Sequence, residues 1–126
     1  MSGSALRTKK HFVTYSPFDV VITPFPLADR SVSVVRPAVI LTDYALFGKT
    51  SGIALVAMIT SAKQSTWPFD APITDLASAG LTLPCVVRTK INAVAYALIE
   101  RKIGSIALSD RGSLRRALSG VFEGVL

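Results

Sequence analysis

The longest uncharged apolar runs in this chain are no longer than a β-strand. Residues 52–60 and 93–99 hold no charged side chain, yet neither approaches the roughly 18 residues that a membrane-spanning helix needs. A short, nearly continuous apolar run is typical of a strand that is covered on both faces. The run at 53–60 therefore predicts a central buried strand, and the rest of the chain has to build a sheet around it.

Other segments rich in β-branched and aromatic residues are predicted as strands, because proline, glycine or polar residues bound each of them. They are 18–25, 34–42, 67–73, 81–87 and 103–106. Prolines interrupt 67–73, which is typical of a broken edge strand. We expect polar loops at 27–33 and 43–52, and either a helical turn or a strand at 93–101.

The C-terminal segment is predicted to be a helix. Ser109 is a suitable N-cap residue, and Leu114, Leu118 and Val121 recur at helical spacing, which gives one apolar face. Three arginines on the other faces are expected to form a solvated surface, namely Arg111, Arg115 and Arg116. Several short strands closed by one helix indicate a mainly β (α+β) domain, a small, partly open β-barrel of the SH3-like type.

Composition places the chain among single-domain globular proteins. Its 126 residues are one domain's length, and with 50% hydrophobic and 17% charged residues it does not have the composition of a disordered chain. One cysteine and one histidine are too few for an internal disulfide or a Cys/His zinc site, and the sequence holds no GxGxxG or GxxxxGK[ST] motif. We expect no metal and no cofactor.

Residues 1–11 are expected to form a flexible tail, followed by one domain at 12–126. The first residues of the tail resemble either a remnant of cloning or a flexible leader. No apolar stretch follows the basic residues of the tail, so we expect no secretion signal, no membrane association and a cytoplasmic location. The net charge of +6 favours a polyanionic partner, nucleic acid above all. Arg7, Lys9 and Lys10 supply three of these charges, so charge alone leaves plain solubility as an equal explanation.

Two short motifs stand at strand ends. Arg36, followed by a proline, opens the strand predicted at 34–42, and the central strand ends in two hydroxyl side chains, Thr60 and Ser61. Each motif has a structural explanation of its own. Arg36 could face solvent or pair with Asp43, and hydroxyls at strand ends often only terminate the ladder.

Taken in order, these motifs and three others resemble the MazF/PemK (Kid) family of toxin endoribonucleases. The family pattern G-D-(I/V)-x-x-(V/A)-x-(F/L)-P corresponds to residues 18–26, R-P-(A/V)-(L/V) and its continuation to 36–41, and a strand ending in (I/V)-(T/S) to 57–61. A piece that contains V-V-R corresponds to 85–91, and (I/L)-G-x-(L/I) to 103–106. The resemblance implies the CcdB/PemK-like form of the small barrel, with its C-terminal helix.

The resemblance implies a growth-inhibiting toxin that cleaves single-stranded mRNA at specific sequences without a metal ion. The ribose 2′-OH attacks its own 3′ phosphate and leaves a 2′,3′-cyclic phosphate and a 5′-OH end. Arg36 would stabilise the negative charge of the phosphorane, because a guanidinium stays protonated and binds two phosphate oxygens. Thr60 would orient the 2′-OH or the phosphate, with Ser61 as its substitute, and Arg88 would be a second phosphate ligand.

The resemblance does not supply a general base. The acidic residue that the pattern has two positions after the V-V-R arginine is Lys90 here, and the histidine of this chain, His11, lies in the tail. Asp29, in the loop at 27–33, and Asp43 are the remaining candidates for the base.

Further contacts to RNA are expected from basic and aromatic side chains. The basic candidates are Arg30, Lys63 and Lys90. Aromatic rings stack on unpaired bases of single-stranded RNA. The aromatic candidates are Phe25, Phe47, Trp67 and Phe69. Burial in the core is the alternative for each aromatic residue, and Trp67, beside a proline on the broken strand, is the one we expect at the surface.

Departures from the pattern leave three alternatives open. Phe18 replaces the glycine of the first motif, and the loop before Arg36 lacks the usual glycines and glutamine. The first alternative is a CcdB-like gyrase poison, which grips a protein and for which the apolar helix face would matter and Arg36 would not. The second is a family relative without nuclease activity. The third is a barrel that binds RNA by charge alone, which a steep salt dependence would reveal.

The resemblance also implies two protein partners. One is a second copy of the chain, in a C2 homodimer that binds RNA at or beside its interface. The other is a cognate antitoxin whose acidic segment fills the same basic groove. The mean hydropathy of +0.48 independently favours a protein partner, because a small domain with spare apolar surface usually covers it.

Overall fold

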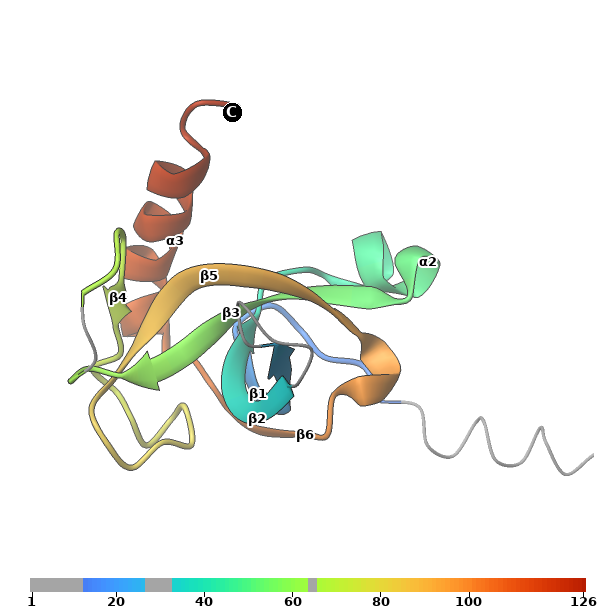
Figure 1. The fold of residues 1–126 in the computed structure, drawn as a ribbon, viewed down its shortest axis with the longest axis horizontal. Helices are drawn as coiled ribbons and strands as arrows, with labels where there is room; N and C mark the ends of the chain where they lie inside the picture. Colours follow the sequence, from blue (N-terminus) through green and yellow to red (C-terminus); the bar gives the residue numbers. More distant parts are fainter. Residues whose placement is uncertain (1–12, 27–32, 64–65) are drawn as a thin grey trace, which may run out of the picture.

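The computed structural model describes residues 13–26, 33–63 and 66–126. Six antiparallel strands form one sheet in the order β4-β5-β3-β2-β1-β6, which curves into a half-barrel (Figure 1). The strands are β1 Asp19–Pro26, β2 Ser33–Ile40, β3 Ile53–Ser61, β4 Ala71–Pro72, β5 Cys85–Ala95 and β6 Arg101–Ser105. The helical segments are η1 Tyr44–Gly48, α2 Lys49–Ser51, η2 Tyr96–Leu98 and α3 Leu108–Phe122. The prediction of a mainly β, partly open barrel with a C-terminal helix is confirmed.

Strand β3 lies inside the sheet and is covered on both faces, as its apolar sequence predicts. Ala57 and Ile59 belong to a cluster that α3 completes with Leu114 and Ala117. The intervening side chains belong to a second cluster on the opposite face, and these are Ala54 and Val56. We call the two sides of the sheet the α3 face and the η2 face, because Tyr96 of η2 packs in the second cluster.

The η2 face is closed by a pair of tyrosines. The Tyr96 hydroxyl donates to the carbonyl of Tyr15 at 3.0 Å and accepts from its N–H at 3.3 Å. Both rings are almost fully buried, and this burial raises the pKa of Tyr96 above its ordinary value. The pair fastens the segment before β1 to the end of β5.

Helix α3 begins at Leu108, one residue before the position that the sequence predicts. Ala107 is the N-cap residue and offers no side-chain hydrogen bond, so Ser109 as the cap is wrong. The first turn is tied to the fold by Asp110, whose carboxylate accepts the backbone N–H groups of Thr74 and Asp75 and the hydroxyl of Thr74. Burial by itself would raise the pKa of Asp110, but these hydrogen bonds outweigh it and hold the pKa below its ordinary value.

Phe18, which stands where the related pattern has glycine, adopts a left-handed backbone with φ of 74°. Its N–H donates to Ile40 and its carbonyl accepts from Ile106, both at 2.9 Å. The guanidinium carbons of Arg111 and Arg115 lie 4.6 Å and 5.0 Å from the centre of its ring. Arg111 is half-buried, so a solvated surface is the wrong expectation for it, whereas Arg115 and Arg116 are exposed as predicted. The cations of Arg111 and Arg115 restrain the ring of this strained residue.

Four segments differ from the predicted elements. Of the strand predicted at 67–73, only Ala71–Pro72 pairs with the sheet. Of the strand predicted at 81–87, only the residues from Cys85 onward belong to the sheet, in a strand that continues to Ala95. The loop expected at 43–52 contains η1 and α2, because the Asp43 side chain accepts the N–H of Leu46 and starts a helical turn that ends at Gly52 with φ of 77°. The ambiguous segment 93–101 contains both alternatives. It continues β5 to Ala95, turns through η2 and enters β6.

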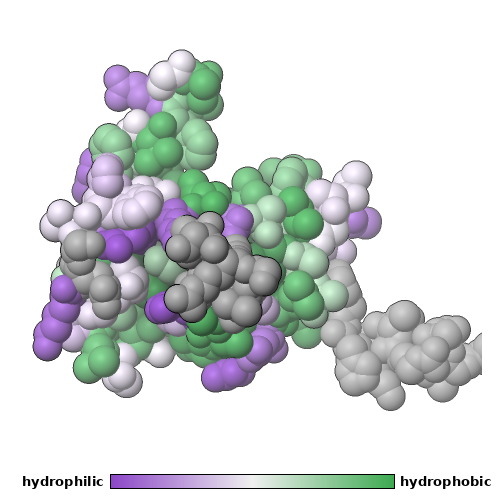
Figure 2. Space-filling view, in the orientation of Figure 1, coloured by the Kyte–Doolittle hydropathy of each residue, from purple (hydrophilic) through white to green (hydrophobic). Residues whose placement is uncertain are grey.

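Apolar side chains remain uncovered on the part of α3 that extends past the sheet (Figure 1) and on η1. The exposed large residues are Leu46 and Phe47 on η1, Val121 and Phe122 on α3, and Val125 and Leu126 directly after α3. Figure 2 shows hydrophobic surface over both regions. Within the described residues, no helix is long and apolar enough to cross a membrane.

Candidate functional site

Polar side chains form a row across the η2 face, where the apolar alternation of four neighbouring strands is broken. Thr23 of β1 is the register partner of Arg36 of β2. At this end of the sheet, the last register pair of β2 and β3 is Ala38 with Met58. Arg36 lies two residues beyond Ala38 on β2, and Thr60 lies two residues beyond Met58 on β3. Arg88 of β5 lies two residues beyond Val86, the register partner of Thr60. Because side chains alternate along a strand, these four side chains share the η2 face, and we call them the polar row.

A register shift in the β3–β5 ladder lies beside this row. Between Ala57 and Ile59 of β3, the partner strand β5 passes from Ile91 to Val87, so β5 uses four residues where β3 uses two. Such bulges bend a strand and re-aim its side chains. Lys90 lies inside this irregular stretch and is half-buried.

Arg36 is the exposed member of the polar row. Among the described residues it makes no hydrogen bond and no ion pair. The alternative partner, Asp43, instead uses its carboxylate to accept the N–H of Leu46. The guanidinium of Arg36 is therefore available to an anion from outside the described part of the chain.

The two threonines of the row are buried beside Arg36. Thr60 is 8% exposed, and its hydroxyl makes no hydrogen bond with the described residues. Thr23 is fully buried, and its Oγ1 is the one buried side-chain polar atom of the described residues without a hydrogen-bond partner. A buried hydroxyl without a partner costs about 1–3 kcal/mol, so Thr23 Oγ1 in the same row as an exposed arginine is unusual for a purely structural surface.

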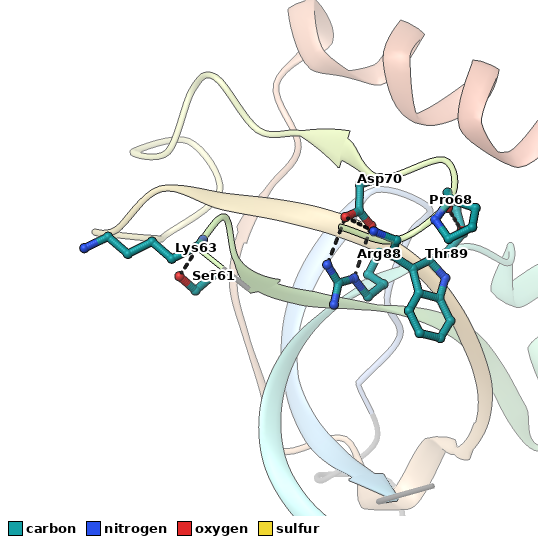
Figure 3. A network of polar contacts seen from close by, with 7 residues as sticks. Ser61, Lys63, Pro68, Asp70, Arg88 and Thr89 are labelled. Carbon is teal, nitrogen blue, oxygen red and sulfur yellow. Dashed lines mark hydrogen bonds and ion pairs between the residues drawn. The ribbon is translucent and has the colours of Figure 1, made fainter. Parts of the chain in front are cut away.

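Arg88 is placed differently from Arg36. Its Nε and Nη2 donate to the two carboxylate oxygens of Asp70, at 3.2 Å and 2.9 Å, and the side chains are 9% and 18% exposed (Figure 3). Its guanidinium carbon lies 5.5 Å from the centre of the Trp67 ring. The sequence predicts Arg88 as a phosphate ligand, but two of its donors are already taken by a carboxylate.

Ser61 and Lys63 lie at the end of β3, apart from the Arg88–Asp70 pair (Figure 3). The Ser61 hydroxyl accepts the N–H of Lys63 at 3.2 Å, which turns the chain after the strand. Lys63 is exposed. The other predicted loop residues, Asp29 and Arg30, lie outside the described residues, as does the tail at 1–11.

The aromatic candidates separate into core and surface. Phe25 is 1% exposed and packs in the cluster on the η2 face, so it is wrong as a stacking residue. Trp67 is 43% exposed, which confirms its predicted place at the surface. Phe69, at 52%, and Phe47 are also partly exposed.

Chemically, the polar row offers one unpaired cation, two hydroxyls and a second cation that is neutralised by a carboxylate. Among the described residues, no group of three or more His, Cys, Asp or Glu side chains could hold a metal ion. Sequence reasoning missed Thr23 and Asp70. Thr23 is a polar residue at the inward-facing parity of β1, where the related pattern has an aliphatic residue, and this signal could have found it. Asp70 pairs with Arg88 across 18 positions of sequence, and no spacing rule links them.

A family model described as the PemK-like, MazF-like toxin of type II toxin–antitoxin systems matches residues 16–122 of the chain. A search of curated protein sequences finds no significant match.

Solved structures share the fold at low sequence identity. The Mycobacterium tuberculosis toxin MazF-mt6 is 23% identical, with a TM-score of 0.63, and the alignment covers 83% of this chain and 96% of that one. MazF from Deinococcus radiodurans is 16% identical, with a TM-score of 0.69, over 89% of this chain and 99% of that one. An endoribonuclease from a mycobacterial species, in complex with its cognate antitoxin, is 12% identical, with a TM-score of 0.65, over 90% and 98%.

Proposed function

This chain belongs to the PemK-like, MazF-like toxin family of type II toxin–antitoxin systems, and on that premise we propose that it is a sequence-specific, metal-independent endoribonuclease that cleaves single-stranded mRNA. One observation carries the proposal. Arg36 is exposed and unpaired within the described residues, on the same face as Thr60, at the same end of two neighbouring strands. An exposed guanidinium beside hydroxyls is suited to bind a phosphodiester.

In the proposed reaction, the 2′-oxygen of the ribose forms a bond to the adjacent phosphorus while the bond from phosphorus to the 5′-oxygen breaks. The 2′-OH loses its proton to a base, and the leaving 5′-oxygen gains a proton. Arg36 stabilises the added negative charge of the pentavalent phosphorane, where fixed positive charge has its largest effect. The Thr60 hydroxyl orients the 2′-OH or a phosphate oxygen, and Ser61 is its substitute.

Other residues of the chain supply RNA contacts. Lys63 and Lys90, with Arg30, bring positive charge to the backbone of the RNA, and Trp67 provides a stacking surface. Asp29 remains the candidate base. Arg88 acts on the RNA through Trp67 and not as a free phosphate ligand, because Asp70 holds its guanidinium.

We further propose that the protein acts in the cytoplasm as a homodimer and is held inactive by a cognate antitoxin. Two of the related structures are complexes with an antitoxin, one of MazE with MazF and one of an endoribonuclease with its cognate antitoxin. The uncovered apolar side chains of α3 and η1 supply the surface that such partners would bury.

The test is incubation of the protein with a long single-stranded RNA in excess EDTA, followed by mapping of the RNA ends. Arg36→Ala is run in parallel, with Arg116→Ala, an exposed arginine of α3, as the matched control. We expect cleavage at a few short motifs with 5′-OH ends, lowered about 10²–10³-fold in Arg36→Ala and unchanged in the control. Intact RNA with folded wild-type protein would overturn the proposal in favour of a gyrase-type poison or an inactive relative. Cleavage by Arg36→Ala at the wild-type rate would overturn the role of Arg36.

A further inference from the structure

Trp67 is the single tryptophan of the chain, and its ring lies against a buried cation while part of its surface stays open. The guanidinium carbon of Arg88 lies 5.5 Å from the ring centre, and the residue is 43% exposed. A cation near the face of an indole ring is attracted to its π-electrons and restrains the ring. The indole is therefore backed by the protein and presents the rest of its surface to solvent.

Asp70 connects this ring to the sheet. Its carboxylate accepts two hydrogen bonds from Arg88, at 3.2 Å and 2.9 Å, and a third from the backbone N–H of Trp67 at 3.3 Å. The N–H of Asp70 in turn donates to the carbonyl of Trp67 at 3.3 Å. One carboxylate therefore fixes both the backbone of Trp67 and the cation that backs its ring.

The segment that carries Trp67 is fastened at two more points. Thr89, next to Arg88 on β5, donates its hydroxyl to the carbonyl of Pro68 at 3.0 Å. Phe69 adopts φ of 60°, and its ring packs so closely on Gly120 of α3 that a Cβ there would lie 2.4 Å from a ring carbon. The turn is thus held to both β5 and α3.

We propose that Asp70 is a positioning residue that, through Arg88, holds the Trp67 indole as the stacking face for one base of the single-stranded RNA; this inference rests on the proposed function. Arg88 belongs to the polar row with Arg36 and Thr60, so a nucleotide near the cleaved phosphate reaches the indole. Stacking on an exposed, pre-oriented ring is the main way in which proteins bind unpaired bases. Without the Asp70 charge, the Arg88 guanidinium loses its counter-ion and the ring loses its orientation.

The test uses the fluorescence of this single tryptophan. Wild type, Asp70→Asn and Arg88→Lys are titrated with two single-stranded RNA oligonucleotides, one of random sequence and one that carries the cleavage motif. Both have 2′-O-methyl riboses, which cannot attack the phosphate. Asp75→Asn is the matched control, because among the described residues its carboxylate accepts only from Ser78 and not from Arg88. Trp67→Ala removes the stacking ring altogether and is expected to bind the oligonucleotides about 5- to 100-fold more weakly. Because this variant has no tryptophan fluorescence, its binding is measured by competition with the wild-type protein. KM and kcat for the cleavable RNA are measured for each variant, and circular dichroism verifies that each is folded.

We expect the oligonucleotides to quench wild-type and Asp75→Asn fluorescence. In Asp70→Asn and Arg88→Lys, quenching falls and KM rises several-fold while kcat changes little. If Asp70→Asn fails to fold, Arg88→Lys decides, because it breaks the same link from the other side. Undiminished quenching and an unchanged KM in the folded variants would overturn the inference. The proposed function would still stand if the wild-type protein cleaves the RNA. Quenching that depends on Asp70 without any cleavage would support the inference as a binding site and overturn the nuclease.

Discussion

On the α3 side of the molecule, the buried carboxylate of Asp110 accepts three hydrogen bonds, whereas on the η2 face Arg36 meets no carboxylate and the buried Oγ1 of Thr23 has no partner among the described residues. Both sides bury polar groups in a chain whose core is otherwise apolar. Satisfied polar groups stabilise a fold, and unsatisfied ones cost free energy. The comparison indicates that the α3 side is built for stability and that the η2 face gives up stability at the polar row.

The row itself repeats this contrast in its two arginines. Arg88 is buried and paired with Asp70, and Arg36 is exposed and has no ion-pair partner in the described part of the chain. The same side chain therefore holds structure in one place and offers charge in another. The predictions below test that division, beginning with the largest expected effect.

Loss of the Asp70 carboxylate, which pairs with Arg88, should lower stability far more than loss of the Arg36 side chain. Asp70→Ala removes the carboxylate that pairs with the buried Arg88 guanidinium and should lower the free energy of unfolding by about 3 kcal/mol. Arg36→Ala removes an exposed side chain and should change it by less than about 0.5 kcal/mol. Urea denaturation followed by circular dichroism measures both. Equal losses in the two variants would show that the division between a structural and a functional arginine is false.

Thr60→Val should lower activity without lowering stability. Valine has nearly the same shape, and the Thr60 hydroxyl makes no hydrogen bond with the described residues that its loss would break. Loss of one positioned hydroxyl at a reacting phosphate should cost about 10²-fold in cleavage rate. Cleavage kinetics and thermal unfolding are compared with Thr60→Ser, which keeps the hydroxyl. A Thr60→Val protein with wild-type kinetics would remove Thr60 from the site.

The strands that build this face could be predicted from sequence because the pattern of apolar residues is local. The run at 53–60 and the segments at 18–25 and 34–42 all form strands of the sheet. The prediction of Ser109 as the N-cap is wrong because the first turn of the helix is held by Asp110, whose partners Thr74 and Asp75 lie 36 and 35 positions earlier in the chain. Contacts between residues far apart in the sequence decide where such a helix begins, and local sequence patterns do not reveal those contacts.

The candidate site divides in the same way. Arg36 and Thr60 could be placed at strand ends from sequence, because the resemblance to a family carries ordered motifs. The partner of Arg88 could not, since Asp70 stands 18 positions away on a segment that reads as an irregular edge. The sequence alone does not show whether an arginine has a carboxylate partner, so only the fold distinguishes Arg36 from Arg88.

The α3 side should respond to pH through Asp110. Hydrogen bonds hold its pKa below the ordinary value of 3.8, so its charged form stabilises the fold above that value and the contribution is lost as pH falls through the lower folded-state pKa. Asp110→Asn should cost about 1–3 kcal/mol at pH 7, because the amide cannot accept all three hydrogen bonds. The gap between wild type and variant, measured by denaturation from pH 7 to pH 3, should narrow below pH 4. A gap that stays constant to pH 3 would assign the effect to packing.

Thr23→Val is the smallest change and the sharpest test of the comparison. The hydroxyl is fully buried without a partner, so replacing it with a methyl group should raise the free energy of unfolding by about 1 kcal/mol. Thermal unfolding and cleavage of the same RNA are measured side by side, with Thr42→Val as the control, because the Thr42 hydroxyl accepts the N–H of Leu55 and its loss should destabilise. A more stable Thr23→Val protein that cleaves RNA more slowly would show that the η2 face keeps an unsatisfied group for its function. A more stable protein with unchanged cleavage would make Thr23 a packing defect and leave Arg36 and Thr60 to carry the site.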